Sequence, residues 1–300
     1  MEKKTLGFVL ASVGPFFWGS SGTVAQHLFE TTNIETLWLV SIRMVVAGAL
    51  LLIYGALRGV PVGAVFRHAG SAAELVAFSI LGMIGTQLTY FMAISAGNAA
   101  TAAILQSLSP VLIIIFLALR TWSVPSKINV ISVVVALLGT VLTITQGDLH
   151  SLVLPISAVV WGLLAAVGAA IYTLMPTRQI KTFGATPIVG WSMLIGGAIV
   201  FVASRAWQHW PQLDIVGWGE VGFVVVFGTM LAYLFFLQSL EYILPTTASV
   251  LGTIEPLSAT VLSVIFLGVS FKPLGIIGAA LIVSVTLLQF MAARAARFGE

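Results

Sequence analysis

The sequence predicts an all-α membrane protein, and three observations lead to this fold class. The chain has 300 residues, of which 59% are hydrophobic and only 8% are charged. A soluble domain has about 25% charged residues, so the composition excludes a water-soluble enzyme. Apolar stretches of about 20 residues recur along the whole chain, which is the length that a helix needs to span a bilayer. These stretches are too long and too uniformly apolar to be barrel strands.

Ten such stretches lie between charges and helix breakers, and we expect each to cross the bilayer as a helix. The first half has 7–27 after a lysine pair, 35–57 before Arg58, 73–95 after Arg67, 98–119 before Arg120, and 127–146 from Lys127. The second half has 152–174 before Arg178, 185–205 after Lys181, 217–240, 246–268, and 273–293 from just after Lys272. The connectors are short, as is usual between antiparallel neighbours.

The basic residues predict how the bundle is oriented. With the N-terminus in the cytoplasm and ten crossings, ten of the thirteen Lys and Arg residues fall on the cytoplasmic side. They are Lys3, Lys4, Arg58, Arg67, Arg120, Lys127, Arg178, Lys181, Arg294 and Arg297. Only Arg205 and Lys272 fall outside, and Arg43 lies within a helix. The positive-inside rule therefore predicts a multi-pass protein of the inner (plasma) membrane with both termini cytoplasmic.

The two halves of the chain repeat the same landmarks in the same order. Trp18-Gly19 matches Trp161-Gly162, Met44…Gly48 matches Met193…Gly197, Gly85-Thr86-x-x-x-Tyr90 matches Gly228-Thr229-x-x-x-Tyr233, and Ala102-Ala103…Pro110 matches Ala248-Ser249…Pro256. We expect residues 1–150 and 151–300 to form two repeats of five helices each. Because five is odd, the second repeat must be inserted upside down, an arrangement typical of secondary transporters.

These residues carry a resemblance to a known family. Trp18-Gly-Ser-Ser-Gly22, Arg43, the stretch from Asn98 to Pro110, and Ile254-Glu255-Pro256-Leu257 together resemble the drug/metabolite transporter superfamily, in its ten-helix branch with two EamA-type repeats. The resemblance implies export or exchange of small metabolites across the inner membrane, with the substrate cavity between the halves. Members often have a Gly-Glu pair after helices four and nine. This chain has Leu119-Arg120-Thr121 and Leu267-Gly268-Val269 instead, so no role of those glutamates transfers.

Two charges lie deep in the predicted helices. At 1.5 Å per residue, Arg43 and Glu255 each lie roughly 12–14 Å from the nearer interface, close to the midplane. A charge there costs about 2.5–3.5 kcal/mol on insertion scales and needs a reason. One hypothesis is substrate recognition, with Arg43 binding a carboxylate or phosphate and Glu255 binding an amine or a proton. The alternative is that the charges brace the bundle, either as a structural ion pair or bound to backbone carbonyls.

Pro110 and Pro256 are predicted hinges, because they lie at equivalent mid-helix positions. A proline inside a helix leaves the carbonyl four residues earlier without its donor, here those of Gln106 and Gly252. Such a carbonyl faces a ligand or water, or is satisfied by a nearby side chain, and the sequence leaves both readings open.

Polar and aromatic residues near these features complete the candidate substrate site. The predicted substrate-binding residues are Trp18, Ser21, Arg43, Gln87, Tyr90, Gln106, Trp161, Tyr233 and Glu255. Glu74 and Glu241 are expected at cytoplasmic helix ends, as solvated caps or gate contacts. The four histidines, His27, His68, His150 and His209, are expected in connectors without metal-ligand spacing, and no cysteine is present. We therefore predict no metal, no cofactor, no catalytic residues and no nucleic-acid partner.

The predicted function is secondary transport of a small metabolite by alternating access. An amino acid or related zwitterion, moving outward, suits one midplane cation, one midplane anion and aromatic neighbours. Proton antiport through Glu255, facilitated diffusion and exchange all remain open as the mechanism of coupling. The alternatives are efflux of lipophilic cationic drugs and, in another class, an ion channel. A membrane-embedded enzyme is not favoured, because no nucleophile or metal set is recognisable. The sequence does not indicate an oligomeric state.

Overall fold

A computed structural model of the chain describes residues 3–122, 127–146, 154–243, 248 and 251–298. Within these ranges every regular element is helical, as predicted. The elements of the first half are α1 (Lys3–Thr31), α2 (Thr36–Leu57), η1 (Ala64–Arg67), α3 (Ala69–Phe78), η2 (Ser79–Ile84), α4 (Gly85–Ala96), α5 (Ala99–Gln106), α6 (Ser109–Thr121) and α7 (Lys127–Thr145). Those of the second half are α8 (Ile156–Leu174), α9 (Thr177–Phe183), α10 (Ala185–Ala203), η3 (Ala206–Gln208), α11 (Ile215–Val225), η4 (Val226–Leu231), α12 (Ala232–Ser239), α14 (Ile254–Leu267) and α15 (Pro273–Phe298).

Eight helical stretches of the described residues are long and apolar enough to span a membrane. They correspond to the first eight predicted segments, with α3, η2 and α4 forming one stretch and α11, η4 and α12 another. The last two predicted segments correspond to the shorter apolar helices Ile254–Leu267 and Pro273–Leu288. Part of the predicted segment 246–268 falls outside the described residues. The chain is therefore a multi-pass helical membrane protein.

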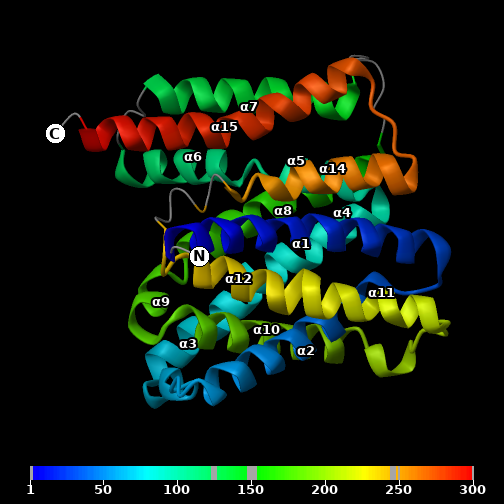
Figure 1. Cartoon of the computed structure of the whole chain (residues 1–300), viewed down its shortest axis with the longest axis vertical. Coiled ribbons are helices and arrows are strands. Elements are labelled where there is room, and N and C mark those ends of the chain that lie inside the picture. The colour runs from blue at the N-terminus through cyan, green and yellow to red at the C-terminus, as the bar shows by residue number, and fades with distance from the viewer. Residues whose placement is uncertain (1–2, 123–126, 147–153, 244–247, 249–250, 299–300) are drawn as a thin grey trace.

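The helices run side by side along one direction, and their order across the molecule is clear in Figure 1. Helices α7 and α15 pack together at one edge, and α2 and α10 pack together toward the opposite edge (Figure 1). Helix α1 runs through the middle and packs against α14 on one side and against α11, η4 and α12 on the other. The beginning of α1 and the end of α15 lie at the same end of the bundle (Figure 1), as an even number of crossings requires.

Glycines at the helix contacts make the packing of the two halves reciprocal. A Cβ added at Gly48 on α2 would lie 3.0 Å from the Met193 Cβ on α10, and one added at Gly197 would lie 2.8 Å from the Met44 Cβ. These four residues are the repeat landmarks Met44…Gly48 and Met193…Gly197. The glycine of each helix thus packs against the methionine of the other helix, which is the contact pattern of a two-fold relationship.

A second repeat landmark packs in the same reciprocal way. Gly19 on α1 lies against the backbone of α14, where an added Cβ would lie 2.8 Å from the Ala259 amide nitrogen. Its repeat partner Gly162 on α8 lies against Leu105 on α5, with 3.0 Å between an added Cβ and the leucine Cβ. Small residues allow this close approach between membrane helices. The Trp-Gly pairs found in the sequence therefore mark equivalent helix contacts.

Local signals in the sequence account for several helix boundaries. Asn98 caps α5, its side-chain oxygen accepting from the Thr101 amide at 2.8 Å, and Asp214 caps α11 in the same way through Gly217. Side-chain acceptors at this position satisfy backbone donors that the first helical turn leaves free. Helix α14 ends at Leu267 and is followed by Gly268, whose φ of 65° is a left-handed conformation that glycine adopts without a Cβ penalty.

The two predicted hinge prolines lie where helices are interrupted. Helix α5 ends at Gln106 and α6 begins at Ser109, so Pro110 lies in the first turn of a new helix, where its missing N–H costs nothing. Pro256 has the same place in α14. Of the two readings left open for the Gly252 carbonyl, the structure shows the satisfied one, because this carbonyl accepts from the amide of the neighbouring Glu255 at 3.1 Å in the turn before α14.

Candidate functional site

The predicted site residues converge around Arg43 in the middle of the bundle. Arg43 is 2% exposed on α2, and its guanidinium is held from two sides. Its Nε donates to the Thr229 hydroxyl at 3.0 Å, and its guanidinium carbon lies 4.0 Å from the centre of the Phe91 ring. The buried Nη1 has no hydrogen-bond partner among the residues that the structure describes. A cation that is oriented but not fully satisfied can bind an anionic ligand group.

Other buried polar atoms near Arg43 also lack partners. The Tyr90 hydroxyl on α4, the Trp18 indole nitrogen on α1 and the Gln106 Oε1 on α5 are buried and make no hydrogen bond with described residues. Tyr90 lies beside Phe91, the ring that covers the Arg43 guanidinium, with 5.6 Å between the Tyr90 and Phe91 ring centroids. Native interiors pair nearly all such atoms with protein, water or ligand. This cluster is therefore a candidate site for a polar ligand.

Glu255 supplies the negative charge of the cluster. It is the second residue of α14, where the positive end of the helix dipole favours a carboxylate. The Gln106 side-chain nitrogen, at the end of α5, donates to the Glu255 Oε1 at 3.5 Å. Both Arg43 and Glu255 are described, yet no ion pair joins them. A direct salt bridge between Arg43 and Glu255 is therefore not formed among the described residues, and the choice between substrate recognition and bracing of the bundle stays a prediction.

Aromatic side chains border the charged cluster. The Trp18 and Tyr233 rings lie edge to face with 4.9 Å between centroids, and Tyr172 on α8 lies 6.2 Å from Tyr233. The Gln87 side chain donates to the Tyr233 hydroxyl at 2.6 Å, which joins α4 to α12. Four of the predicted residues, Trp18, Gln87, Tyr90 and Tyr233, thus contribute three aromatic rings and one amide to this region.

Two predicted residues have less connection to the cluster. The Ser21 hydroxyl donates to the Trp18 carbonyl at 2.9 Å, and its side chain fills the contact between α1 and Gly228. Trp161 is half-buried on α8 and packs against the main hydrophobic core. The geometry thus assigns Ser21 a helix-packing contact. The binding roles predicted for both residues stay predictions.

Two residues that orient Arg43 were not among the predicted site residues. Thr229 lies in η4, a π-helical segment, and Phe91 follows Tyr90 on α4. The repeat Gly85-Thr86-x-x-x-Tyr90 and Gly228-Thr229-x-x-x-Tyr233 includes Thr229, so the signal was present in the sequence. Phe91 had no such signal, because a phenylalanine in an apolar helix is ordinary.

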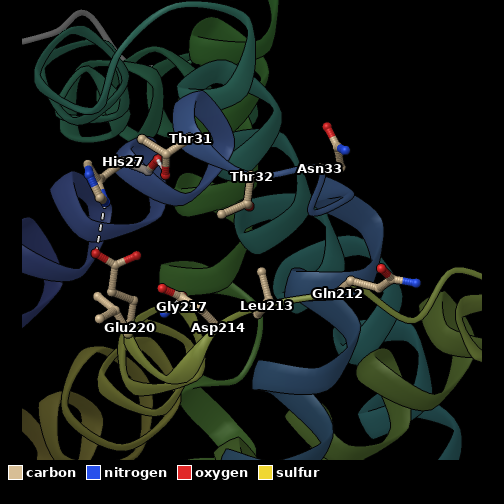
Figure 2. A pocket seen from close by; sticks show the side chains of 10 residues that line it. His27, Thr31, Thr32, Asn33, Gln212, Leu213, Asp214, Gly217 and Glu220 are labelled. Atoms are coloured by element: carbon tan, nitrogen blue, oxygen red, sulfur yellow. Dashed lines mark hydrogen bonds and ion pairs between the residues drawn. The ribbon is translucent and has the colours of Figure 1, made fainter.

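A separate polar pocket of about 440 Å³ lies between the end of α1 and the start of α11 (Figure 2). Figure 2 shows His27 on α1 and Glu220 on α11 facing each other, with 2.8 Å between the His27 Nδ1 and a Glu220 carboxylate oxygen. The pocket is lined by His27, Thr31, Thr32, Asn33, Gln212, Leu213, Asp214, Val216, Gly217 and Glu220. The expectation that His27 lies in a connector is wrong, because α1 continues to Thr31 past the apolar stretch. Of the other histidines, His150 lies outside the described residues.

Polar contacts join the two halves of the chain at both ends of the bundle. At the pocket end, His27 meets Glu220, and His209 lies 2.9 Å from Glu35. At the end where the termini lie, Glu74 on α3 accepts from Arg178 at 3.3 Å. Among the described residues, no group of three or more His, Cys, Asp and Glu could hold a metal ion.

Comparison with known proteins agrees with this architecture. The model of the EamA-like transporter family matches the chain twice, over residues 5–145 and 156–291. The uncharacterized inner membrane transporter YicL of Salmonella typhimurium is 34% identical over 289 residues, which cover 96% of this chain and 95% of that protein. The uncharacterized transporter YyaM of Bacillus subtilis is 24% identical and covers 71% of both chains.

A solved crystal structure has the same fold. It covers 98% of this chain and 99% of its own, with a TM-score of 0.64 and 18% sequence identity, so the likeness concerns the fold alone. The resemblance inferred from Trp18-Gly-Ser-Ser-Gly22 and its companions is confirmed by the family match over both halves. The relatives and the apolar helices support a multi-pass protein of the inner membrane. The chain belongs to the EamA-like transporter family, with one copy of the family repeat in each half.

Proposed function

We propose that this chain is a ten-helix secondary transporter that moves a small zwitterion, an amino acid or a related metabolite, outward by alternating access. Residues 1–150 and 151–300 are the two oppositely inserted repeats, and both termini are cytoplasmic. The reciprocal contacts of Gly48 and Gly197 support the two-fold relationship. The two ends of the molecule open in turn, and Pro110 and Pro256 are the hinges at the interrupted helices.

One observation carries the substrate class: the buried cluster has a cation and an anion that do not pair with each other. Arg43 keeps Nη1 unpartnered beside the unpartnered Tyr90 hydroxyl, and these two donors suit a carboxylate. Glu255 and the unpartnered Gln106 Oε1 are acceptors and suit an ammonium group. A zwitterion satisfies both sets together, whereas a lipophilic cation leaves the donors of Arg43 and Tyr90 unpaired.

A ligand series with purified protein tests this proposal. L-Phenylalanine has both charges, L-phenylalaninamide lacks the carboxylate, and 3-phenylpropionate lacks the ammonium group. Because a ligand that binds the folded state raises its melting temperature, the series is read as ligand-dependent thermal shifts. We expect phenylalanine to bind more tightly than either analogue. The Arg43→Gln variant should remove the preference for the acid over the amide, while Arg67→Gln, at an exposed arginine, should not.

Flux from proteoliposomes separates the rival functions. Ethidium efflux that phenylalanine does not inhibit would favour transport of lipophilic cations and contradict the zwitterion proposal. Ion currents in a planar bilayer at rates beyond those of a transporter would indicate a channel. Glu255→Gln tests proton coupling, because we expect the variant to lose the pH dependence of flux while it remains folded. Flux whose pH dependence is unchanged would remove Glu255 from coupling.

A further inference from the structure

The arginine at the centre of the cluster is held by a helix that departs from α-helical geometry. The stretch from α11 to α12 passes through η4 (Val226–Leu231), a π-helical segment. Within it, the Thr229 hydroxyl donates to the Val224 carbonyl, five residues earlier, at 2.8 Å. Since that bond uses the hydroxyl proton, the oxygen's lone pairs remain to accept from the Arg43 Nε at 3.0 Å. Thr229 is fully buried, so no water competes for this position.

We propose that Thr229 is a positioning residue, which orients Arg43 so that its Nη edge faces the anionic group of the substrate. This inference rests on the proposed function and names a determinant of specificity within the same site. A guanidinium has five N–H donors in a rigid plane, so fixing Nε fixes the direction of the remaining donors. The Phe91 ring, 4.0 Å from the guanidinium carbon, covers one face and prevents rotation out of this plane. The unpartnered Nη1 is the donor that this arrangement leaves for a ligand.

The internal repeat supplies a contrast that supports the assignment. Thr86 has the position in the first half that Thr229 has in the second, and it follows another π-helical segment, η2 (Ser79–Ile84). The Thr86 hydroxyl is buried but has no partner among the described residues. The landmarks Met44…Gly48 and Met193…Gly197 place Ser192 as the counterpart of Arg43, so the second repeat offers no arginine to Thr86. The threonine of this motif orients a guanidinium only where the opposite repeat supplies one.

The test compares how variants discriminate phenylalanine from phenylalaninamide. Thr229→Val removes the acceptor and keeps the shape, Thr229→Ser keeps a hydroxyl, and Thr86→Val is the matched control at the repeat-related position. If the guanidinium of Arg43 points in the wrong direction, phenylalanine binds more weakly because its carboxylate loses a partner. The affinity for phenylalaninamide, which has no carboxylate, should not change. Because a hydrogen bond to a charged group is among the stronger ones, we expect Thr229→Val to reduce the preference for the acid about tenfold. Thr229→Ser and Thr86→Val should keep the wild-type preference.

The possible outcomes distinguish a failure of the positioning role of Thr229 from a failure of the zwitterion proposal. If Thr229→Val weakens acid and amide equally, or leaves the preference intact in folded protein, Thr229 does not position Arg43. If Thr229→Val does not fold, Thr229→Ala removes the same acceptor with less apolar bulk, and the same comparison applies. If the wild-type protein itself shows no preference for the acid, the zwitterion proposal fails and this inference fails with it. A preference present in the wild type but unaffected by Thr229→Val overturns the positioning role alone.

Discussion

Replacing Gly48 by alanine tests the reciprocal contact between α2 and α10. The new Cβ would lie 2.7 Å from the Leu194 amide nitrogen, 2.8 Å from the Gly190 carbonyl oxygen and 3.0 Å from the Met193 Cβ. The two nearest atoms belong to the backbone, so no side chain can rotate to relieve the overlap. The whole helix pair must separate by a few tenths of an ångström. We therefore expect Gly48→Ala to destabilise the protein.

The size of the effect follows from two opposing contributions. Overpacking of a well-packed contact costs about 1–3 kcal/mol, and a contact with backbone atoms belongs in the upper part of that range. Replacing a helical glycine by alanine contributes about 1 kcal/mol in the other direction. The net loss for Gly48→Ala is about 1–2 kcal/mol. Gly222 on α11 is the matched control, because a Cβ there meets nothing within 4 Å and Gly222→Ala should gain up to about 1 kcal/mol.

Unfolding by titration with sodium dodecyl sulfate in mixed micelles measures both variants against the wild type. The reciprocal variant Gly197→Ala should cost a similar amount. Because its Cβ would enter the same helix contact, the double variant should cost less than the sum of the two. If Gly48→Ala proved as stable as Gly222→Ala, α2 and α10 would not be packed as described. Simple additivity of Gly48→Ala and Gly197→Ala would show that the two substitutions do not share one helix contact.

Three further predictions concern caps, ends and the site. Asn98→Ala should lower the free energy of unfolding by about 1 kcal/mol, because the Thr101 amide loses its capping acceptor, whereas Asn98→Asp keeps an acceptor and should not. If the two variants were equally stable in the same titration, the cap would not contribute to stability. In this cysteine-free chain, His27→Cys with Glu220→Cys, joined by a short bifunctional thiol reagent, should block flux in proteoliposomes, whereas either single variant treated alike should not. Undiminished flux after verified cross-linking would show that this end need not open. Gly22→Ala would place a Cβ 2.9 Å from the Tyr90 hydroxyl oxygen and should weaken phenylalanine binding severalfold in thermal-shift titrations; unchanged affinity would remove that hydroxyl from the site.

The membrane helices were predictable because bilayer thickness constrains them directly. The predicted segment 35–57 corresponds to α2, Thr36–Leu57, with a difference of one residue. Helix α9 was not predicted, since its seven residues include Arg178 and Lys181 and belong to a connector by hydropathy. The same reasoning placed His27 in a connector. Helical hydrogen bonding continues past the apolar stretch, and hydropathy does not register that.

The candidate site was predictable in its members but not in its arrangement. Arg43 and Glu255 are easy to recognise in the sequence, because a charged side chain within an apolar membrane helix is costly and therefore rare. Their depth along the helices follows from counting residues. Whether they pair depends on how each helix is rotated about its own axis and on which helices adjoin, and the apolar pattern of an almost wholly hydrophobic helix does not settle that rotation. The π-helical register that places Thr229 against Arg43 likewise has no hydropathy signal.

The scaffold is symmetric, but its charges are not, and this difference bears on direction. Gly48 and Gly197 exchange equivalent contacts, so packing alone gives the two halves equal roles. Arg43 comes from the first half, and its counterpart in the second half is the uncharged Ser192, whereas Glu255 comes from the second half. A substrate held by both charges therefore always has its carboxylate toward the first repeat and its ammonium group toward the second. Opening either end moves the repeats relative to each other and strains those two contacts unequally. In the proposed mechanism, any preference for outward movement must then come from this charge asymmetry or from ion coupling, because the reciprocal packing favours neither end.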